Sequence, residues 1–174
     1  MKKPLLFICL LALLVSCNRG EKATSTTAGN EAPTDLPYNV SYSSSWSDNI
    51  SDEDLELVLM SYKDWASGNM AGLGNAMGDS VEYDMNTGKR LEQSRAQLMD
   101  MWTTSRDSLK SVSIDMQAWN RMYATDKKDA FIVTWYKEID TYKDGRVDSA
   151  YYHDINQVKD GKIVWYSQYK RPAK

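Results

Sequence analysis

The pattern of hydrophobic and polar residues divides the chain into a helical first half and a strand-rich second half. An apolar face with the i, i+3, i+4, i+7 spacing of a helix predicts a first helix after Ser51. This face consists of Leu55, Val58, Leu59, Tyr62, Trp65 and Ala66. Ser51 precedes three acidic residues, so its hydroxyl is expected to cap this helix while the acids complement the helix dipole. A short second helix over 70–77, a strand over 81–85 and an amphipathic helix from Leu91 to about Ser105 are expected to follow.

From Val112 onward the hydrophobic period becomes two, which predicts β-strands. Asp144-Gly145 and Asp160-Gly161 separate long alternating runs, and Asp-Gly between such runs is the strongest short hairpin signal. The second half is therefore predicted to be a four-stranded antiparallel meander. Its strands are expected over about 111–124, 129–142, 146–158 and 162–170. Helices followed by such a meander make one α+β domain.

The first seventeen residues have the pattern of an export signal. Lys2 and Lys3 precede an apolar run from Leu5 to Val15, which is too short to cross a bilayer as a helix. The segment Leu14-Val15-Ser16-Cys17 resembles the lipobox of bacterial lipoproteins, in which the cysteine receives a lipid and becomes the mature N-terminus. The resemblance implies lipidation of Cys17 and a lipid-anchored location in the bacterial cell envelope, on the periplasmic side or the cell surface. An ordinary secretory peptide is the alternative.

Residues 18–50 are predicted to be a flexible tether, because they are rich in Ser, Thr, Asn, Gly and Pro and show no helical period. Tyr38, Val40, Tyr42 and Trp46 leave open whether the end of this tether lies extended along the domain. The predicted organisation is a signal over 1–17, a tether over 18–50 and one folded domain over 51–174.

Composition narrows the classes of function. The 174 residues are 42% hydrophobic and 26% charged, which suits one domain with a core. The net charge of −3 becomes −5 without Lys2 and Lys3, so nucleic acid is not an expected partner. Cys9 would leave with the signal and Cys17 would carry lipid, which excludes disulfides and thiol catalysis in the domain. The chain has one histidine, and neither a metal site nor a cofactor is expected.

The order of the elements carries a second resemblance. The hairpin over 158–164, followed by Tyr166 and Tyr169, and the segment Gly88-Lys89-Arg90-Leu91 before the long helix are similar to the nuclear transport factor 2-like (SnoaL-like) superfamily. The similarity covers about residues 51–170. It implies a cone-shaped, curved antiparallel sheet wrapped around N-terminal helices, a cystatin-like or nuclear transport factor 2-like fold with a pocket at one end. It implies less about function, because the superfamily contains isomerases, cyclases, dehydratases and binding domains without catalysis.

Turn geometry predicts the register of the meander. If Asp144-Gly145 and Asp160-Gly161 are two-residue loops, the more apolar face of the sheet is expected to be concave and covered by helices. That face is expected to carry Met116, Met122, Phe131, Val133, Trp135, Ile139, Ala150, Tyr152, Val158, Ile163, Trp165 and Tyr169. One polar rung crosses it, made of Asn120, Trp135, Asp154 and Ser167. His153 is expected to point to the opposite face.

Asp154 is the leading candidate for a functional group, because a carboxyl on an apolar inward face must be paired, hydrated or shifted in pKa. It is either a structural residue bonded to Asn120, Ser167 or water, or a general base of the kind that the resemblance implies. Tyr83, Tyr152 or Tyr169 would then be the oxyanion donor. The predicted ligand pocket consists of Asn120, Trp135, Tyr152, Asn156, Trp165, Ser167 and Tyr169.

The favoured function is a membrane-tethered envelope lipoprotein whose domain binds a small apolar ligand or a protein partner without catalysis. The alternative is a SnoaL-like isomerase, cyclase or dehydratase with Asp154 as general base. A third hypothesis is a dimerising module that scaffolds other envelope proteins. The resemblance also implies that the outer sheet face suits a homodimer, and the sequence leaves open whether one forms.

Overall fold

The computed structural model describes residues 36–173, and the predicted signal and lipidation site at Cys17 lie outside this range. A compact unit begins at Val40. Its elements in chain order are β1 (Trp46–Ser47), α1 (Asp52–Ser67), α2 (Met70–Ala76), β2 (Met77–Asp84), β3 (Arg90–Ser94), α3 (Arg95–Asp107), β4 (Leu109–Ala124), β5 (Asp129–Tyr142), β6 (Val147–Lys159) and β7 (Lys162–Pro172). The predicted α+β class and the C-terminal meander are confirmed.

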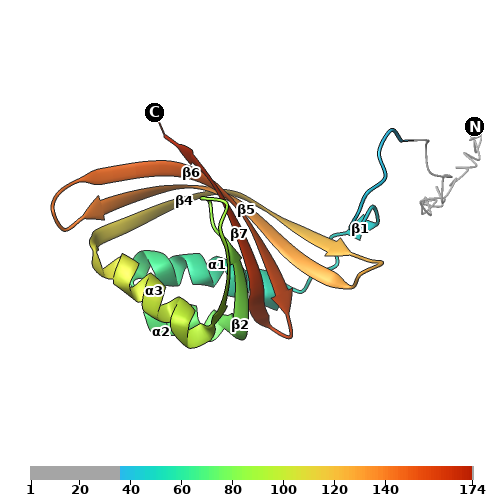
Figure 1. The fold of residues 1–174 in the computed structure, drawn as a ribbon, viewed down its shortest axis with the longest axis horizontal. Helices are drawn as coiled ribbons and strands as arrows, with labels where there is room; N and C mark the ends of the chain where they lie inside the picture. The colour runs from blue at the N-terminus through green and yellow to red at the C-terminus, as the bar shows by residue number, and fades with distance from the viewer. Residues whose placement is uncertain (1–35, 174) are drawn as a thin grey trace, which may run out of the picture. The chain divides into compact units, whose positions relative to one another are not determined.

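The strands form a single curved sheet, and the three helices of the described residues lie on one side of it (Figure 1). The strand order is β1-β4-β5-β6-β7-β2-β3. Neighbouring strands are antiparallel, except that β2 runs parallel to β7. This parallel pairing places the β2–β3 hairpin beside the last strand of the meander, so that α3, which follows β3, packs under the sheet.

The helices begin where side chains can cap them. Ser51 caps α1 by accepting a hydrogen bond from the backbone N–H of Asp54, as predicted, and Gly68 ends α1 at a φ of 78° that favours glycine. Ser94 and Gln97 form a capping box at the start of α3. The predicted start of that helix at Leu91 is therefore wrong, because residues 90–94 form β3 and pair with β2.

The segment before α1 packs against the sheet. Trp46 and Ser47 pair with the end of β4, and Ser43 donates a hydrogen bond to Asp126 Oδ1 at 2.5 Å. The end of the segment interpreted as tether therefore lies extended along the domain, which settles the question left open by its aromatic residues. The compact unit includes residues 40–50 as well as the expected 51–174.

Two irregularities change the predicted faces of the sheet. The β5–β6 connection is a three-residue loop in which Tyr142 pairs with Arg146 and Gly145 has a φ of 88°, so β5 is shifted by one residue relative to the expected register. A bulge between Gln157 and Val158 shifts β7 in the same way. Since a shift of one residue reverses every side chain, a set expected on the concave face lies on the outer face. It consists of Met122, Phe131, Val133, Trp135, Ile139, Trp165 and Tyr169.

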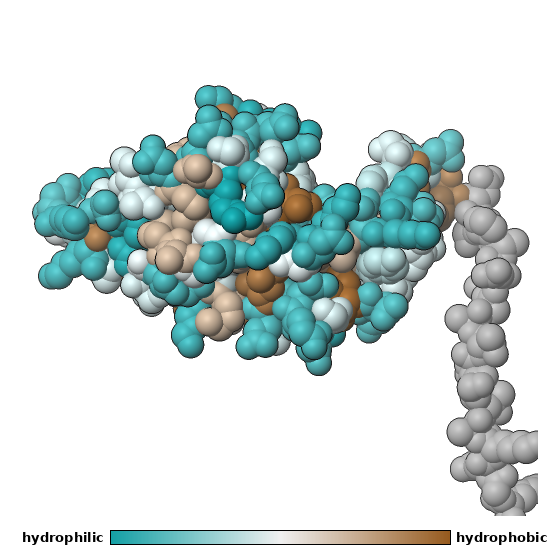
Figure 2. Space-filling model, turned by 90° about the horizontal axis from the view of Figure 1, so that it is seen from below, coloured by the Kyte–Doolittle hydropathy of each residue, from teal (hydrophilic) through white to brown (hydrophobic). Residues whose placement is uncertain are grey.

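The core lies between the helices and the concave face of the sheet. Val58 of α1 and Leu98 of α3 are fully buried there against a cluster that includes Ile132 and Ile163. Seen from below in Figure 2, the surface is largely hydrophilic, with hydrophobic residues in small separate groups. No helix within residues 36–173 is both long and apolar enough to cross a membrane.

Candidate functional site

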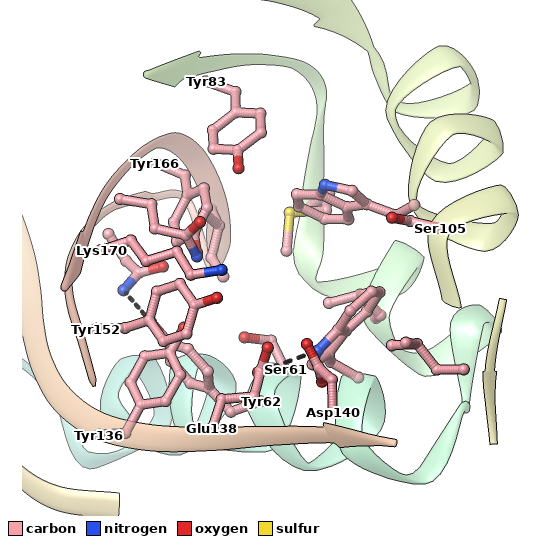
Figure 3. A pocket seen from close by; sticks show the side chains of 18 of the residues that line it. Ser61, Tyr62, Tyr83, Ser105, Tyr136, Glu138, Asp140, Tyr152, Tyr166 and Lys170 are labelled. Carbon is pink, nitrogen blue, oxygen red and sulfur yellow. Dashed lines mark hydrogen bonds between the residues drawn. The ribbon is translucent and has the colours of Figure 1, made fainter. Parts of the chain in front are cut away.

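A cavity of about 300 Å³ lies between the helices and the concave face of the sheet (Figure 3). α1, α2 and α3 form one wall, and β2, β5, β6, β7 and the start of β4 form the other. Its lining is rich in aromatic side chains, namely Tyr62, Trp65, Tyr83, Trp102, Tyr136, Tyr142, Tyr152 and Tyr166. A small number of polar groups converge on the same space, among them Ser61, Glu138, Asp140, Asn156, Gln168 and Lys170. Such a combination is typical of small-molecule sites.

Asp154 lies directly behind the floor of this cavity, fully buried, and three tyrosines separate it from the open space. Its Oδ2 accepts hydrogen bonds from the hydroxyls of Tyr62, Tyr136 and Tyr166 at 3.1, 2.7 and 2.8 Å. The three tyrosines line the cavity, whereas Asp154 does not. Asn156 donates a further hydrogen bond to Tyr62 Oη at 3.1 Å. The hydroxyls are thus fixed by one central carboxyl.

Burial and hydrogen bonding act in opposite directions on this carboxyl. Burial raises the pKa of Asp154 to about 7, although the hydrogen bonds from the tyrosines favour the charged form and lower it. Burial and the nearby charge of Asp154 raise the pKa of Tyr62, Tyr136 and Tyr166 well above the usual value. The tyrosines therefore remain protonated donors at neutral pH.

A second carboxyl, that of Glu138, lies in the cavity wall itself. It is 8% exposed, and Trp65 Nε1 donates a hydrogen bond to its Oε2 at 3.2 Å. Burial, followed by the charges of Asp140 and Asp154, raises the pKa of Glu138 to about 8. Asp140 follows on the same face of β5, and burial raises its pKa as well. In Figure 3 both side chains point from β5 into the cavity.

The cations near these acids are bonded elsewhere. Lys170 Nζ lies 3.2 Å from Asp148 Oδ2, above the ring of Tyr152. Arg106 of α3 donates to the backbone carbonyls of Trp65 and Ala66 at 3.0 and 3.1 Å and so completes the C-terminal end of α1. In residues 36–173, neither Glu138 nor Asp140 has an ion pair within 4.0 Å.

The structure brings together only part of the predicted pocket. Tyr152 and Asn156 line the cavity, and Asp154 is inward and buried as expected, but its partners are tyrosines and not Asn120 or Ser167. The predicted rung is wrong, because Asp154 lies opposite Thr134 and Gln168. Asn120, Trp135, Trp165, Ser167 and Tyr169 belong to the outer face as a consequence of the shifted register.

The outer face holds aromatic groups of its own. Trp135 stacks on His153 with ring centroids 4.8 Å apart, and Tyr169 lies on the other side of the histidine at 5.9 Å. His153 is therefore on the opposite face from Asp154, as expected. Trp165 lines an outer groove of about 600 Å³, defined by Tyr42, Trp46, Glu82, Arg90, Met122, Asp129, Phe131, Val133, Ile155, Gln157 and Trp165.

Glu138, Tyr136 and Tyr166 were not predicted as site residues. The expected register assigns their chain neighbours Trp135, Ile139 and Trp165 to the concave face instead. A signal for them exists in Gly145, since glycine at this position also fits a three-residue hairpin loop, which would have placed Tyr136 and Glu138 beside Asp154. Within the described residues there is no group of three or more His, Cys, Asp or Glu that could hold a metal ion.

The chain matches no protein-family model and no curated protein. Solved structures do match. An LEH-like epoxide hydrolase from M. tuberculosis has a TM-score of 0.58 at 11% identity, with 68% of this chain and 83% of that chain covered. A nuclear transport factor 2-like protein of unknown function from Burkholderia xenovorans has 0.53 at 17%, covering 71% and 86%.

Another nuclear transport factor 2-like protein, from Anabaena variabilis, has a TM-score of 0.53 at 13% identity, with 71% of this chain and 92% of that chain covered. Identities this low establish the fold alone, and the fold is shared by binding proteins and enzymes. The curved sheet, the helices on its concave side and these matches agree: the chain has the nuclear transport factor 2-like fold.

Proposed function

We propose that the cavity binds a small ligand with a flat, mainly apolar body, and that the domain holds this ligand without converting it. The observation that carries this proposal is the closed floor. Oδ2 of Asp154 accepts the three tyrosine hydroxyls, Oδ1 is buried without a partner among residues 36–173, and Asp154 does not line the cavity, so the carboxyl is out of reach of a ligand proton. A general base must lie within hydrogen-bond reach of the proton that it removes. Asp154 acts instead by fixing the orientation of the tyrosines.

A second candidate function is an acid–base enzyme of the isomerase, cyclase or dehydratase kind, with Glu138 in place of Asp154 as the group that exchanges a proton. Glu138 lines the cavity, and its pKa is raised to about 8, near the range that suits a proton donor or acceptor at neutral pH. The similar fold of the M. tuberculosis hydrolase is compatible with this candidate. If this second candidate is correct, wild-type protein converts its ligand to a product that accumulates, whereas Glu138→Gln does not.

The ligand-binding proposal is tested with a panel of flat aromatic fragments and a variant with a blocked cavity. Ser105 of α3 is exposed at the cavity wall, so the indole of Ser105→Trp is expected to fill the opening without disturbing the core. Thr104→Trp places the same bulk on an exposed position of α3 that does not line the cavity. Fragments should bind wild-type protein and Thr104→Trp alike and lose most of their affinity for Ser105→Trp. Equal binding to all three proteins contradicts the proposal.

The same proposal includes lipid attachment at Cys17 in the bacterial envelope. It rests on Lys2, Lys3, the apolar run from Leu5 to Val15 and the segment 14–17. Labelling of cells with a fatty acid analogue should mark the wild-type chain and leave Cys17→Ser unlabelled. Label on Cys17→Ser, or none on the wild type, contradicts lipidation.

A second copy of the chain remains the proposed partner of the outer face. Trp135 and Tyr169 are exposed there, and Trp135 stacks on His153. Exposed aromatic residues of this kind are enriched at protein interfaces. Light scattering of wild-type protein should give the mass of a dimer, and Trp135→Lys should give that of a monomer. A monomeric wild type at high micromolar concentration contradicts this proposal.

A further inference from the structure

The cavity wall contains two acids, Glu138 and Asp140, that form no ion pair in residues 36–173, and this pair indicates the chemistry of the ligand. Glu138 is nine-tenths buried. Among residues 36–173, its Oε2 accepts a hydrogen bond from Trp65, and its Oε1 has no hydrogen-bond partner. Oδ1 of Asp140 is buried and has no hydrogen-bond partner within the same residues. A buried carboxyl oxygen without a partner is costly, so Asp140 Oδ1 is suited to receive a hydrogen-bond donor from a ligand, as is the free Oε1 of Glu138 beside it. Asp154 Oδ1 is also buried without a partner among the described residues, but Asp154 does not line the cavity.

In residues 36–173, no cation lies within 4.0 Å of either carboxyl, although, against the larger effect of burial, the charge of Lys170 acts on both from a greater distance and lowers their pKa. Lys170 is 3.2 Å from Asp148, which lies opposite Asp140 on β6, and the guanidinium of Arg106 is bonded to backbone carbonyls. Burial has the largest effect on the pKa of Asp140 and raises it; the charge of Lys170 comes next and lowers it, and the charge of the exposed Asp148 raises it again. Among the described residues, three acids, Glu138, Asp140 and Asp148, therefore face two cations, Lys170 and Arg106, at this place.

The walls around the pair favour an organic cation. Trp65, Tyr142 and Tyr152 line the cavity together with this pair, and aromatic faces attract cations through their quadrupole. Two of these rings already attract protein cations, because Arg146 lies over Tyr142 at 3.9 Å and Lys170 over Tyr152 at 5.6 Å. A metal ion would need at least three protein ligands, and the described residues contain no such group. An anionic ligand would face Glu138 and Asp140 without compensation.

We propose that the ligand of this cavity is an organic amine, with its ammonium group between Glu138 and Asp140 and its flat apolar body against the aromatic walls. The inference rests on the proposed ligand-binding function and adds the chemical class. Three donors of an ammonium group suffice for the free oxygens of both carboxyls. Tyr62, Tyr136 and Tyr166 line the same cavity and present their rings to the body of the ligand.

Binding of an ammonium group to this pair has a proton balance that can be measured. Glu138 binds a proton in the free protein near neutral pH, because burial raises its pKa to about 8. When the ammonium binds, that proton leaves for solvent and the carboxylate pairs with the cation. The affinity for an amine should therefore rise with pH, by up to about tenfold per pH unit below pH 8. The titratable and charged groups that face this end are Tyr62 of α1, Arg106 of α3, Asp140 and Tyr142 of β5, Asp148, Tyr152 and Asp154 of β6 and Lys170 of β7.

The test compares two probes of equal shape, tryptamine and its alcohol analogue tryptophol, by calorimetric titration between about pH 6 and pH 8.5. Tryptamine should bind at least about tenfold more tightly than tryptophol at the upper pH, and its affinity should rise with pH while that of tryptophol stays level. Glu138→Gln should bring the two affinities within about threefold of each other. Glu92→Gln, which changes an exposed glutamate of β3 without a side-chain partner in the described residues, should behave as wild type.

The outcomes separate the two proposals. If tryptophol binds as tightly as tryptamine at every pH, the cavity binds small molecules but the amine inference is overturned. If neither probe nor any fragment of the aromatic panel binds, the proposed function fails together with the inference. A preference for tryptamine that survives in Glu138→Gln would also contradict the inference, because the charge would then act elsewhere.

Discussion

The hydroxyl of Tyr136 donates a hydrogen bond of 2.7 Å to Asp154 Oδ2, across the neighbouring strands β5 and β6. Both side chains are on the concave face, where Tyr136 is 3% exposed and Asp154 is fully buried. This bond, together with those from Tyr62 and Tyr166, closes the floor of the cavity. The position of the central carboxyl explains why the floor presents phenol rings and not an acid to a ligand.

Loss of the Tyr136 hydroxyl should destabilise the fold. Tyr136→Phe leaves Asp154 with one hydrogen-bond donor fewer in a buried place, and we expect the free energy of unfolding at neutral pH to fall by about 1–3 kcal/mol. Urea denaturation measures this difference. Tyr152→Phe is the control, because the Tyr152 hydroxyl has no hydrogen-bond partner within residues 36–173, and it should change stability by less than about 0.5 kcal/mol. Equal losses in both variants would contradict the assignment of the floor.

The raised pKa of Glu138 predicts how stability depends on pH. The folded state retains the Glu138 proton up to about pH 8, whereas the unfolded chain releases it near the ordinary value of 4.5. Between these values the folded state binds more protons, so this contribution is complete below pH 4.5 and is lost as the pH rises to about 8. Denaturant unfolding at a series of pH values should show Glu138→Gln gaining stability relative to wild type over this window. The slope is up to about 1.4 kcal/mol per pH unit.

Glu92→Gln is the matched control for that series, and its stability should run parallel to the wild type at every pH. A difference between wild type and Glu138→Gln that stays constant from about pH 5 to pH 8 would show that Glu138 is not buried as a neutral acid.

The N-terminal segment should contribute to stability. A chain that begins at residue 48 lacks β1, the Ser43–Asp126 hydrogen bond and the contact of Trp46 with Phe131, whose rings lie 6.2 Å apart. We expect its free energy of unfolding to be about 1–3 kcal/mol lower than that of a chain that begins at residue 40. Trp46→Ala in the longer chain should reproduce part of the loss. Identical thermal midpoints for the two chains would place residues 40–47 outside the cooperative unit.

The sequence was sufficient for the elements whose ends have strong local signals. Ser51 caps α1, and the Asp160-Gly161 turn joins β6 to β7 where it was expected. Residues 90–94 were misassigned because Leu91 fits the apolar face of a helix, whereas its pairing with Tyr83 depends on contacts distant in sequence. Local patterns cannot weigh such contacts, so the boundary between β3 and α3 depends on the tertiary structure.

The candidate site was only partly predictable for a related reason. The inward position of Asp154 followed from alternation along one strand, but its neighbours depend on the register between strands. One extra residue in the loop before β6 and one bulge in the β6–β7 hairpin exchanged the faces of β5 and β7. The structure therefore places Glu138 in the cavity and Trp135 on the outer face, the reverse of their expected positions. A register error of one residue exchanges the two faces of a strand. Where both faces carry aromatic residues, the alternation pattern does not reveal the error.

The indole N–H signals of the six tryptophans test the central claim most directly, because these residues mark separate parts of the protein. Trp65 and Trp102 line the cavity, Trp46 and Trp165 line the outer groove, and Trp119 and Trp135 lie elsewhere on the sheet. In a titration with tryptamine followed by nitrogen–proton correlation spectra, the signals of Trp65 and Trp102 should shift and saturate while the other four stay in place. Shifts confined to Trp46 and Trp165, or no saturable shift of Trp65 and Trp102, would contradict the assignment of the cavity as the ligand site.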